Sequence, residues 1–394
     1  MRIAVVGAGV VGLAAAHELI QAGHEVRCFD SGEPMAARSS GGTRIFRLAH
    51  RAPALVDAAR QAGRGWRDWS RAAGVPLVGS EGVVVSGDIE DTAAAMTAAG
   101  ARCQVMHRPP PGLPAADPAG PFLLDPAGGA IQAAATGRLL LDSVGPYLHR
   151  ATVTAVSAAG PDRVVPDAVG PVGTVGPDGV APIDAVDPVA AVAPVGIDGV
   201  RGGGAEVALA GGGSWVCDSV VIAAGASTPR LAAQVGIEVP DTLVHHARFT
   251  FPLREPRATP PCWLDWAGGW QPGFSSYGHL AGPGLWAVGG HLPVGQTRWD
   301  LGREAVTEAS RRIVTQYVTE HVTGAEPAIV DTVYCDVMLD LGDGILSARS
   351  GPVLAVWGNN LFKFAPLLAR KLARSAVELS VPFPTPAATA PAGE

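Results

Sequence analysis

The chain has 394 residues, of which 47% are hydrophobic and 16% charged, so it is long enough for two or three domains and apolar enough for a large core. Its 29 basic and 36 acidic residues give a net charge of -7, and no basic run is long enough to follow a phosphate backbone. Nucleic acid is therefore not expected as a partner. Five widely spaced cysteines without a CxxC pair argue against a disulfide framework and a zinc site, so no metal is expected.

The N-terminal segment predicts a dinucleotide-binding unit. Residues 2–30 have the pattern of strand, glycine turn, helix and strand, and the turn is a GxGxxG motif formed by Gly7, Gly9 and Gly12. Asp30 follows 23 positions after the first glycine. This is the spacing of the acidic residue that accepts hydrogen bonds from ribose hydroxyls in such units. The glycines permit a tight turn and a close approach to a pyrophosphate at the helix N-terminus. The alternatives are a signal peptide and a glycine turn without a nucleotide.

Six further elements are predicted along the chain. One of them, the strand at 218–225, is expected to pair within the sheet that contains the N-terminal strand. No stretch outside the N-terminus has about 18 consecutive apolar residues, so no transmembrane helix and no membrane association are expected. The predicted elements are a helix at 55–72, a strand at 82–86, a strand and turn at 122–131, a helix at 132–143, a strand at 218–225 and a helical segment at 228–236.

Two segments have the composition of loops. Residues 159–204 contain proline or glycine every few positions and repeat short motifs, which predicts a low-complexity insertion between two strands. A partner-docking role for the insertion is a second interpretation. The tail from 382 to 394 is rich in proline, alanine and threonine, and it is expected to be flexible.

Three stretches beyond the dinucleotide motif carry a resemblance to a known family. They are Gly41-Gly42-Thr43-Arg44-Ile45-Phe46-Arg47, Val333-Tyr334-Cys335-Asp336-Val337-Met338, and Gly358-Asn359-Asn360-Leu361-Phe362-Lys363-Phe364. In this order they resemble the FAD-dependent amine oxidases of the monomeric sarcosine oxidase and N-methyltryptophan oxidase type, within the D-amino acid oxidase superfamily. The resemblance covers most of the chain apart from the insertion and the tail.

The resemblance implies an α/β (α+β) fold in which an FAD-binding Rossmann-like domain is interleaved with a mixed-sheet substrate domain. The FAD-binding domain is expected to be discontinuous, and a substrate domain is expected to be inserted between its parts. The expected boundaries are 1–78, 137–228 and 330–381 for the FAD-binding domain, and 79–136 and 229–329 for the substrate domain.

The resemblance also implies the cofactor and the site residues. FAD is expected to be attached covalently through Cys335, although a buried free cysteine is the common alternative for this residue type. Arg47 and Lys363 match the positions that hold a substrate carboxylate, and surface ion pairs are their alternative. The full expected set is Arg44, Lys363, Arg47 and His291 as catalytic residues, and Gly7, Gly9, Gly12, Asp30, Ser40, Thr43, Arg44, Cys335 and Lys363 as cofactor-binding residues.

The sequence departs from the family at three positions. Ser40 stands where a histidine is usual, and Val337 where a tyrosine follows the cysteine. The lysine that activates dioxygen above the flavin is replaced by Trp286 or Ala287, between which the sequence does not decide. His245, His246 and His291 are candidate acid or base groups, although a histidine in a loop is more often a structural residue.

The resemblance implies oxidation of a secondary amine, an N-methyl amino acid or a cyclic imino acid. A hydride passes to flavin N5, an imine forms, and dioxygen is reduced to hydrogen peroxide. One alternative is a dehydrogenase or desaturase with another electron acceptor, suggested by the missing lysine. A second is a non-catalytic flavoprotein whose insertion docks a partner. The protein is expected to be cytoplasmic, with a small-molecule amine substrate and dioxygen as partners.

Overall fold

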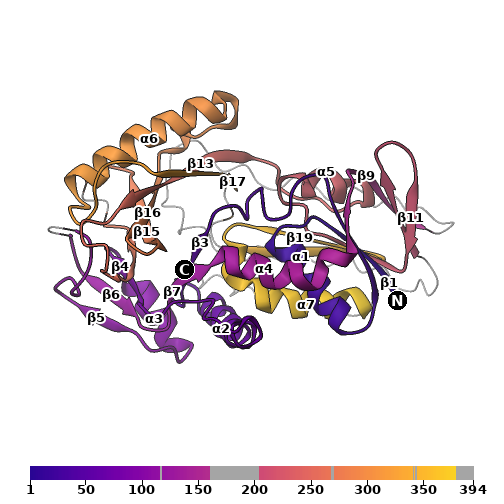
Figure 1. The fold of residues 1–394 in the computed structure, drawn as a ribbon, viewed down its shortest axis with the longest axis horizontal. Helices are drawn as coiled ribbons and strands as arrows, with labels where there is room; N and C mark the ends of the chain where they lie inside the picture. Colours follow the sequence, from indigo (N-terminus) through magenta and orange to yellow (C-terminus); the bar gives the residue numbers. More distant parts are fainter. Residues whose placement is uncertain (116–117, 160–203, 268–269, 340, 342–343, 379–394) are drawn as a thin grey trace, which may run out of the picture.

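The computed structural model describes residues 1–115, 118–159, 204–267, 270–339, 341 and 344–378. Two large sheets lie side by side along the long axis of the molecule (Figure 1). The predicted insertion and tail fall almost entirely outside the described residues, so their interpretation stays a prediction.

The first sheet contains the N-terminal strand. Its order is β18-β19-β12-β1-β2-β8, and its pairs are parallel except for β18 with β19. Buried apolar residues fill both of its faces, as is usual for parallel strands. Its strands are β1 (Arg2–Val6), β2 (Glu25–Asp30), β8 (Leu148–Arg150), β12 (Ser219–Ile222), β18 (Ile345–Ser350) and β19 (Val353–Gly358).

Different layers cover the two faces of this sheet. Ile3 and Val5 of β1 pack against α1 (Val10–Gln21), α4 (Ala133–Val144) and α7 (Ala365–Val377), which lie together in Figure 1. Ala4 and Val6 alternate with them and pack against the opposite layer. That layer contains β9 (Val153–Ala159), β10 (Gly204–Leu209), β11 (Ser214–Cys217), α5 (Thr228–Ala232) and the 3-10 turns η2 (Gly225–Ser227) and η3 (Ala233–Val235).

The second sheet has the order β17-β13-β16-β15-β14-β4-β6-β5 and mixes parallel with antiparallel pairs. Helix α6 (Arg303–Glu320) covers one of its faces (Figure 1), where Phe249, Phe251 and Trp286 are buried. The strands are β4 (Val83–Ser86), β5 (Gln104–Met106), β6 (Phe122–Asp125), β13 (Leu243–Pro252), β14 (Cys262–Asp265), β15 (Ser275–Gly282), β16 (Leu285–His291) and β17 (Asp331–Met338).

The remaining elements connect the two sheets. Strands β3 (Thr43–Phe46) and β7 (Gly129–Gln132) form a two-stranded antiparallel sheet between them (Figure 1). Helix α2 (Pro53–Ala73) packs against α7, and α3 (Glu90–Ala98) against α2. Short 3-10 turns complete the structure: η1 (Gly145–Tyr147), η4 (Val294–Gln296), η5 (Trp299–Leu301) and η6 (Leu361–Phe364).

The predicted fold class is confirmed, since the structure is a mixed α/β protein with an N-terminal parallel sheet and a second, mixed sheet. The strand predicted at 218–225 pairs with β1, as expected. Strand β17, which lies in a segment expected to belong to the FAD-binding domain, pairs with β13 of the second sheet. The domain boundaries stay predictions.

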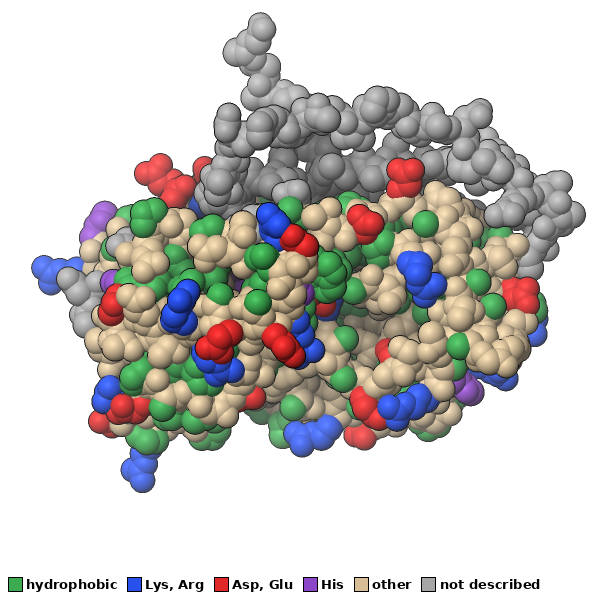
Figure 2. Space-filling view, turned by 90° about the horizontal axis from the view of Figure 1, so that it is seen from above, with side chains coloured by type: hydrophobic (Ala, Val, Ile, Leu, Met, Phe, Trp, Pro, Cys, Tyr) green, Lys and Arg blue, Asp and Glu red, His purple; other side chains and the backbone are tan. Residues whose placement is uncertain are grey.

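The surface carries charges of both signs. On the face shown in Figure 2, acidic and basic side chains are interspersed with hydrophobic ones. Among the described helices, none combines the length and the apolar character needed to cross a bilayer.

Candidate active site

The glycine motif forms a crowded turn between β1 and α1. A Cβ atom at Gly12 would lie 1.9 Å from the carbonyl oxygen of Gly7, and one at Gly7 would lie 2.4 Å from that of Ala223. Gly7 also has a φ of 108°, which side-chain-bearing residues rarely adopt. At the end of β2, the Asp30 carboxylate accepts hydrogen bonds from the backbone N–H groups of Ala8 (2.6 Å) and Gly32 (2.8 Å). The turn and the acidic residue therefore lie together, as the sequence predicted.

We expect Gly12→Ala to lower the fraction of purified protein that carries flavin by about tenfold, because a methyl group forced against Gly7 costs about 1 to 3 kcal/mol and displaces α1 from β1. The flavin-to-protein absorbance ratio measures this. Gly145→Ala is the control, since nothing lies within 4 Å of its added methyl group. Equal flavin content in both variants would contradict a close approach of the cofactor to this turn.

A polar loop leads from β2 to β3 and joins the two sheets. Arg38 forms an ion pair with Asp336 of β17 (3.3 Å) and donates a hydrogen bond to Asn359 Oδ1 (2.8 Å). Asn359 in turn exchanges hydrogen bonds with the backbone of Met338. Arg44 donates to the backbone oxygens of Thr43 (2.7 Å), Arg38 (3.1 Å) and Ser40. These contacts hold the loop against the end of β17.

The second sheet presents its polar face toward this loop. Because directly opposed residues in paired strands share a face, the register brings Cys335, His246 and His291 into one row. The adjacent row contains Arg248, Gly289 and Tyr277. We call the side of the sheet that carries these two rows the site face. A Cβ at Gly289 would lie 2.3 Å from the ring of Tyr277, so glycine is needed for this ring to lie across β16.

Arginines surround the Cys335 thiol. Burial raises the pKa of Cys335, and the positive charges of Arg44, Arg248 and Arg38 oppose that rise. Burial and the neighbouring Arg248 lower the pKa of Arg44 to about 10, which leaves Arg44 charged at neutral pH. The thiol thus lies in an electropositive environment, the kind in which reactive cysteines occur.

The three candidate histidines divide between the two faces of the sheet. His246 and His291 stack on the site face with ring centroids 5.4 Å apart, and Tyr277 Oη lies 2.9 Å from His246 Nε2. Burial, with His291 and Arg248 nearby, lowers the pKa of His246 to about 3, so this imidazole is neutral at neutral pH. His245 instead stacks on Trp299 at 4.5 Å, away from the site face.

Arg47 and Lys363 are both buried, with 7% and 5% of their surfaces exposed, which is inconsistent with surface ion pairs. The Arg47 guanidinium lies 5.3 Å from the centre of the Trp266 ring. Lys363 Nζ lies 5.5 Å from the Phe364 ring, against which His50 also stacks. Through its stacking on His50, Phe364 connects the segment after β3 to η6. Their carboxylate-binding role stays a prediction.

Trp286 and Ala287, the two residues that could stand where the family has its lysine, lie on opposite faces of β16. Trp286 is fully buried among the apolar residues under α6. Ala287 has the opposite orientation, because side chains alternate along a strand, and it pairs with His279 of β15. Ala287, and not Trp286, therefore lies on the site face.

Sequence reasoning missed Arg248, Tyr277 and His279. All three lie on strands in which buried residues occupy both faces, so no simple alternation of polar and apolar residues distinguishes them. A signal was nevertheless present, since an arginine inside an apolar strand needs a buried partner or ligand.

These residues fit FAD. Gly7 and Gly12 keep the turn between β1 and α1 tight, and the N-terminus of α1, where Val10 N–H donates to Ser39 Oγ at 3.0 Å, is the end of a helix that favours an anion. Arg248 of the site face and Arg44 of β3 supply two guanidiniums whose charges act on the thiol of Cys335. Gly7, Gly9, Gly12 and Asp30 would hold the nucleotide part, and Thr43, Arg44 and Cys335 would line the ring.

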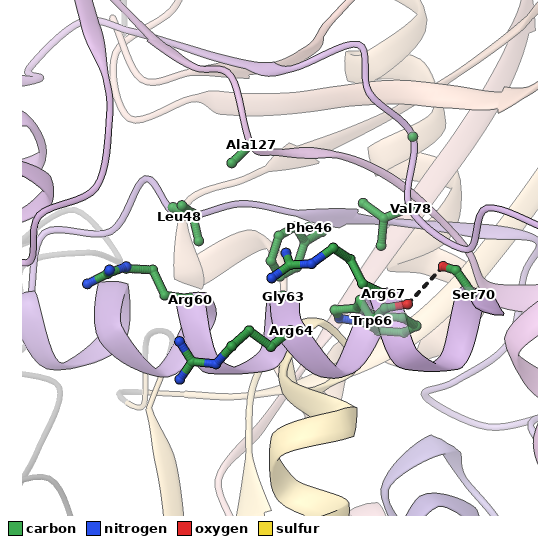
Figure 3. A pocket seen from close by; sticks show the side chains of 11 residues that line it. Phe46, Leu48, Arg60, Gly63, Arg64, Trp66, Arg67, Ser70, Val78 and Ala127 are labelled. Atoms are coloured by element: carbon green, nitrogen blue, oxygen red, sulfur yellow. Dashed lines mark hydrogen bonds between the residues drawn. The ribbon is translucent and has the colours of Figure 1, made fainter. Parts of the chain in front are cut away.

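A separate surface groove of about 460 Å³ lies between α2 and β3 (Figure 3). Its lining residues include Arg60, Arg64 and Arg67 of α2, and none of the expected site residues. Its base contains Trp66, whose indole N–H donates to the backbone oxygen of Lys363 at 2.8 Å and whose ring stacks on Phe362. The groove therefore lies beside Trp66, the residue that contacts η6, and it is not the candidate active site.

Comparisons with known proteins agree with this geometry. Residues 2–169 match the family model of FAD dependent oxidoreductases. No curated protein sequence matches significantly. Among solved structures, the open form of NikD, an unusual amino acid oxidase essential for nikkomycin biosynthesis, superposes with a TM-score of 0.72 at 20% identity, covering 96% of this chain and 94% of that chain.

Two further structures show the same fold. Iminodiacetate oxidase (IdaA) from Chelativorans sp. BNC1 has a TM-score of 0.68 at 16% identity, covering 97% of both chains. L-proline dehydrogenase from P. horikoshii has a TM-score of 0.71 at 15% identity, covering 97% of this chain and 95% of that chain. The resemblance stated from the sequence is thus confirmed to this extent: residues 2–169 match the family of FAD dependent oxidoreductases, and the chain has the fold of these amine and amino acid oxidases.

Proposed function

We propose that the chain oxidises a secondary amine, an N-methyl amino acid or a cyclic imino acid to an imine, with FAD attached through Cys335. When bound, FAD accepts the hydride from the carbon next to the amine nitrogen. The observation that carries the proposal is the position of Lys363. It is buried in η6 directly after β19, at the carboxyl ends of the parallel strands, where ligands bind in open α/β sheets.

Residues of this chain orient the substrate relative to the flavin ring. A guanidinium and an ammonium, Arg47 and Lys363, form a carboxylate clamp that fixes the substrate carbon relative to the ring. His246 is neutral, and together with Tyr277 it provides a polar surface without a fixed charge. Such a surface accommodates an amine in its neutral form, which is the form that releases a hydride.

Anaerobic bleaching of the flavin tests this function. A panel of secondary amines and cyclic imino acids should include compounds that reduce the flavin, and their carboxylate-free analogues should do so poorly. Failure of every amine to bleach a flavin that dithionite reduces normally would favour the non-catalytic alternative.

Dioxygen is the proposed electron acceptor, and Ala287 provides the reason to expect a slow reaction. A fixed charge beside the ring stabilises the negative charge that forms on dioxygen. Because Ala287 supplies none, we expect photoreduced enzyme to reoxidise in air more slowly than enzymes that carry the lysine. Arg44→Met and His291→Ala are each expected to slow it further, by about tenfold for the loss of one charge-assisted contact.

Stopped-flow mixing with oxygenated buffer measures this rate. A fast reaction that neither substitution changes would refute the role of these two side chains. No reaction with oxygen would instead identify a dehydrogenase, the second candidate function, which the absence of a lysine at Ala287 favours.

A further inference from the structure

Arg248 of β13 is a buried cation with an incomplete set of partners. Only 6% of its surface is exposed, and its Nη1 donates to the Thr43 backbone oxygen at 3.1 Å. Its Nε atom is buried and has no hydrogen-bond partner. Within the part of the chain that the structure describes, no carboxylate forms an ion pair with it. A buried guanidinium is always charged and is strongly unfavourable without a counter-charge.

His279 of β15 does not provide that counter-charge. Its Nε2 lies 3.4 Å from Arg248 Nη1. A guanidinium only donates, so a hydrogen bond between these two atoms uses Nε2 as the acceptor. Burial and Arg248 hold the pKa of His279 well below its usual range, so the ring is neutral. Its Nδ1 is also buried without a partner. Arg248 Nε and His279 Nδ1 are therefore both buried nitrogens without a hydrogen-bond partner.

The position of Arg248 indicates which ligand supplies the missing charge. A Cβ at Gly41 would lie 2.7 Å from Arg248 Nη2, so the guanidinium contacts the polar loop directly. Its charge also acts on Arg44 and on Cys335. Two mutually repelling guanidiniums beside the proposed attachment point of the flavin form a preorganised anion site, which lies where the ring of the cofactor is expected.

We propose that Arg248, positioned by Thr43 and His279, is a cofactor-binding residue that faces the flavin ring and stabilises the negative charge the ring carries after it has taken up two electrons and one proton. The proposal rests on the FAD of the proposed function, and it does not depend on which amine is oxidised. It also explains why Arg248 needs no carboxylate, because its counter-charge appears on the cofactor when the ring is reduced.

Sulfite is a suitable probe, because it requires no substrate. Its lone pair forms a covalent bond to the oxidised ring, and the adduct places negative charge on the ring, so a nearby cation tightens binding. Absorbance titration of the holoenzyme should give a sulfite Kd that is about ten- to a hundredfold weaker in Arg248→Met, the range for loss of one charge-assisted interaction. The reduction potential, measured by dye equilibration with a chemical reductant, should fall in the same variant.

Three further variants make the test specific. Arg248→Lys keeps the charge and should remain close to the wild type. Arg248→Gln keeps hydrogen-bonding capacity without the charge, and it should resemble Arg248→Met, which secures the test if the methionine variant does not retain flavin. Arg349→Met removes another partly buried guanidinium, on β18, and should bind sulfite normally.

Unchanged sulfite affinity and potential in Arg248→Gln would overturn the proposal. So would a selective loss of carboxylate ligands with normal sulfite binding, which would assign Arg248 to the substrate. Failure of all amines to reduce the flavin, with the sulfite results as expected, would refute the proposed function alone.

Discussion

Cys335→Ser is expected to release all of the flavin into the supernatant after acid precipitation, whereas the wild-type flavin should remain with the precipitated protein. The physical reason is that a thioether forms only from a nucleophilic sulfur, and serine provides no equivalent at neutral pH. Cys335 lies on the site face, opposite His246, with Arg44, Arg248 and Arg38 opposing the effect of burial on its pKa. The surrounding positive charge limits the rise in the Cys335 pKa that burial and Asp336 cause.

Cys103→Ser is the matched control, because Cys103 is also only partly buried and lies on the segment before β5. This variant should retain its flavin in the precipitate. If the wild-type supernatant carries all of the flavin, the cofactor is not covalently bound and Cys335 is an ordinary free cysteine.

Lys363→Met is expected to weaken binding of carboxylate-bearing substrates by about ten- to a hundredfold, since the loss of one charge-assisted hydrogen bond costs about 1.5 to 3 kcal/mol. Methionine keeps the length and apolar stem of lysine, so the packing against Phe364 should survive. The measurement is the KM or Kd of paired ligands that differ only in the carboxylate. The ligand without the carboxylate should be affected by less than about threefold, the level of a substitution without a specific mechanism.

The chain offers a stringent control for this prediction, because its only other lysine is Lys371, on α7. Lys371→Met removes the same charge from the protein and should leave both ligands unaffected. An equal loss for the two ligands in Lys363→Met would mean that Lys363 acts on the structure of η6 and not on the carboxylate.

The candidate site combines local motifs with positions that depend on strand register. The glycine turn, α1 and Asp30 were predictable because their constraints are local, within 30 consecutive residues. Asn360, with a φ of 54°, and Phe362, which stacks on Trp66, form the turn that buries Lys363. The motif around Lys363 was visible in the sequence, whereas its burial depends on contacts with α2, about 300 positions away.

The sequence by itself determined the N-terminal unit and the resemblance to FAD-dependent amine oxidases, because each depends on short patterns of residue types. Only the tertiary structure decided that Ala287 faces the site, that His245 faces away from it and that β17 joins the second sheet. These facts depend on the register and facing of long-range strand pairs, in which a shift by one residue exchanges the two faces. Arg248 could be recognised as a candidate site residue only from the tertiary structure for the same reason. Its lack of a partner for Nε matters only because the paired strands bury it.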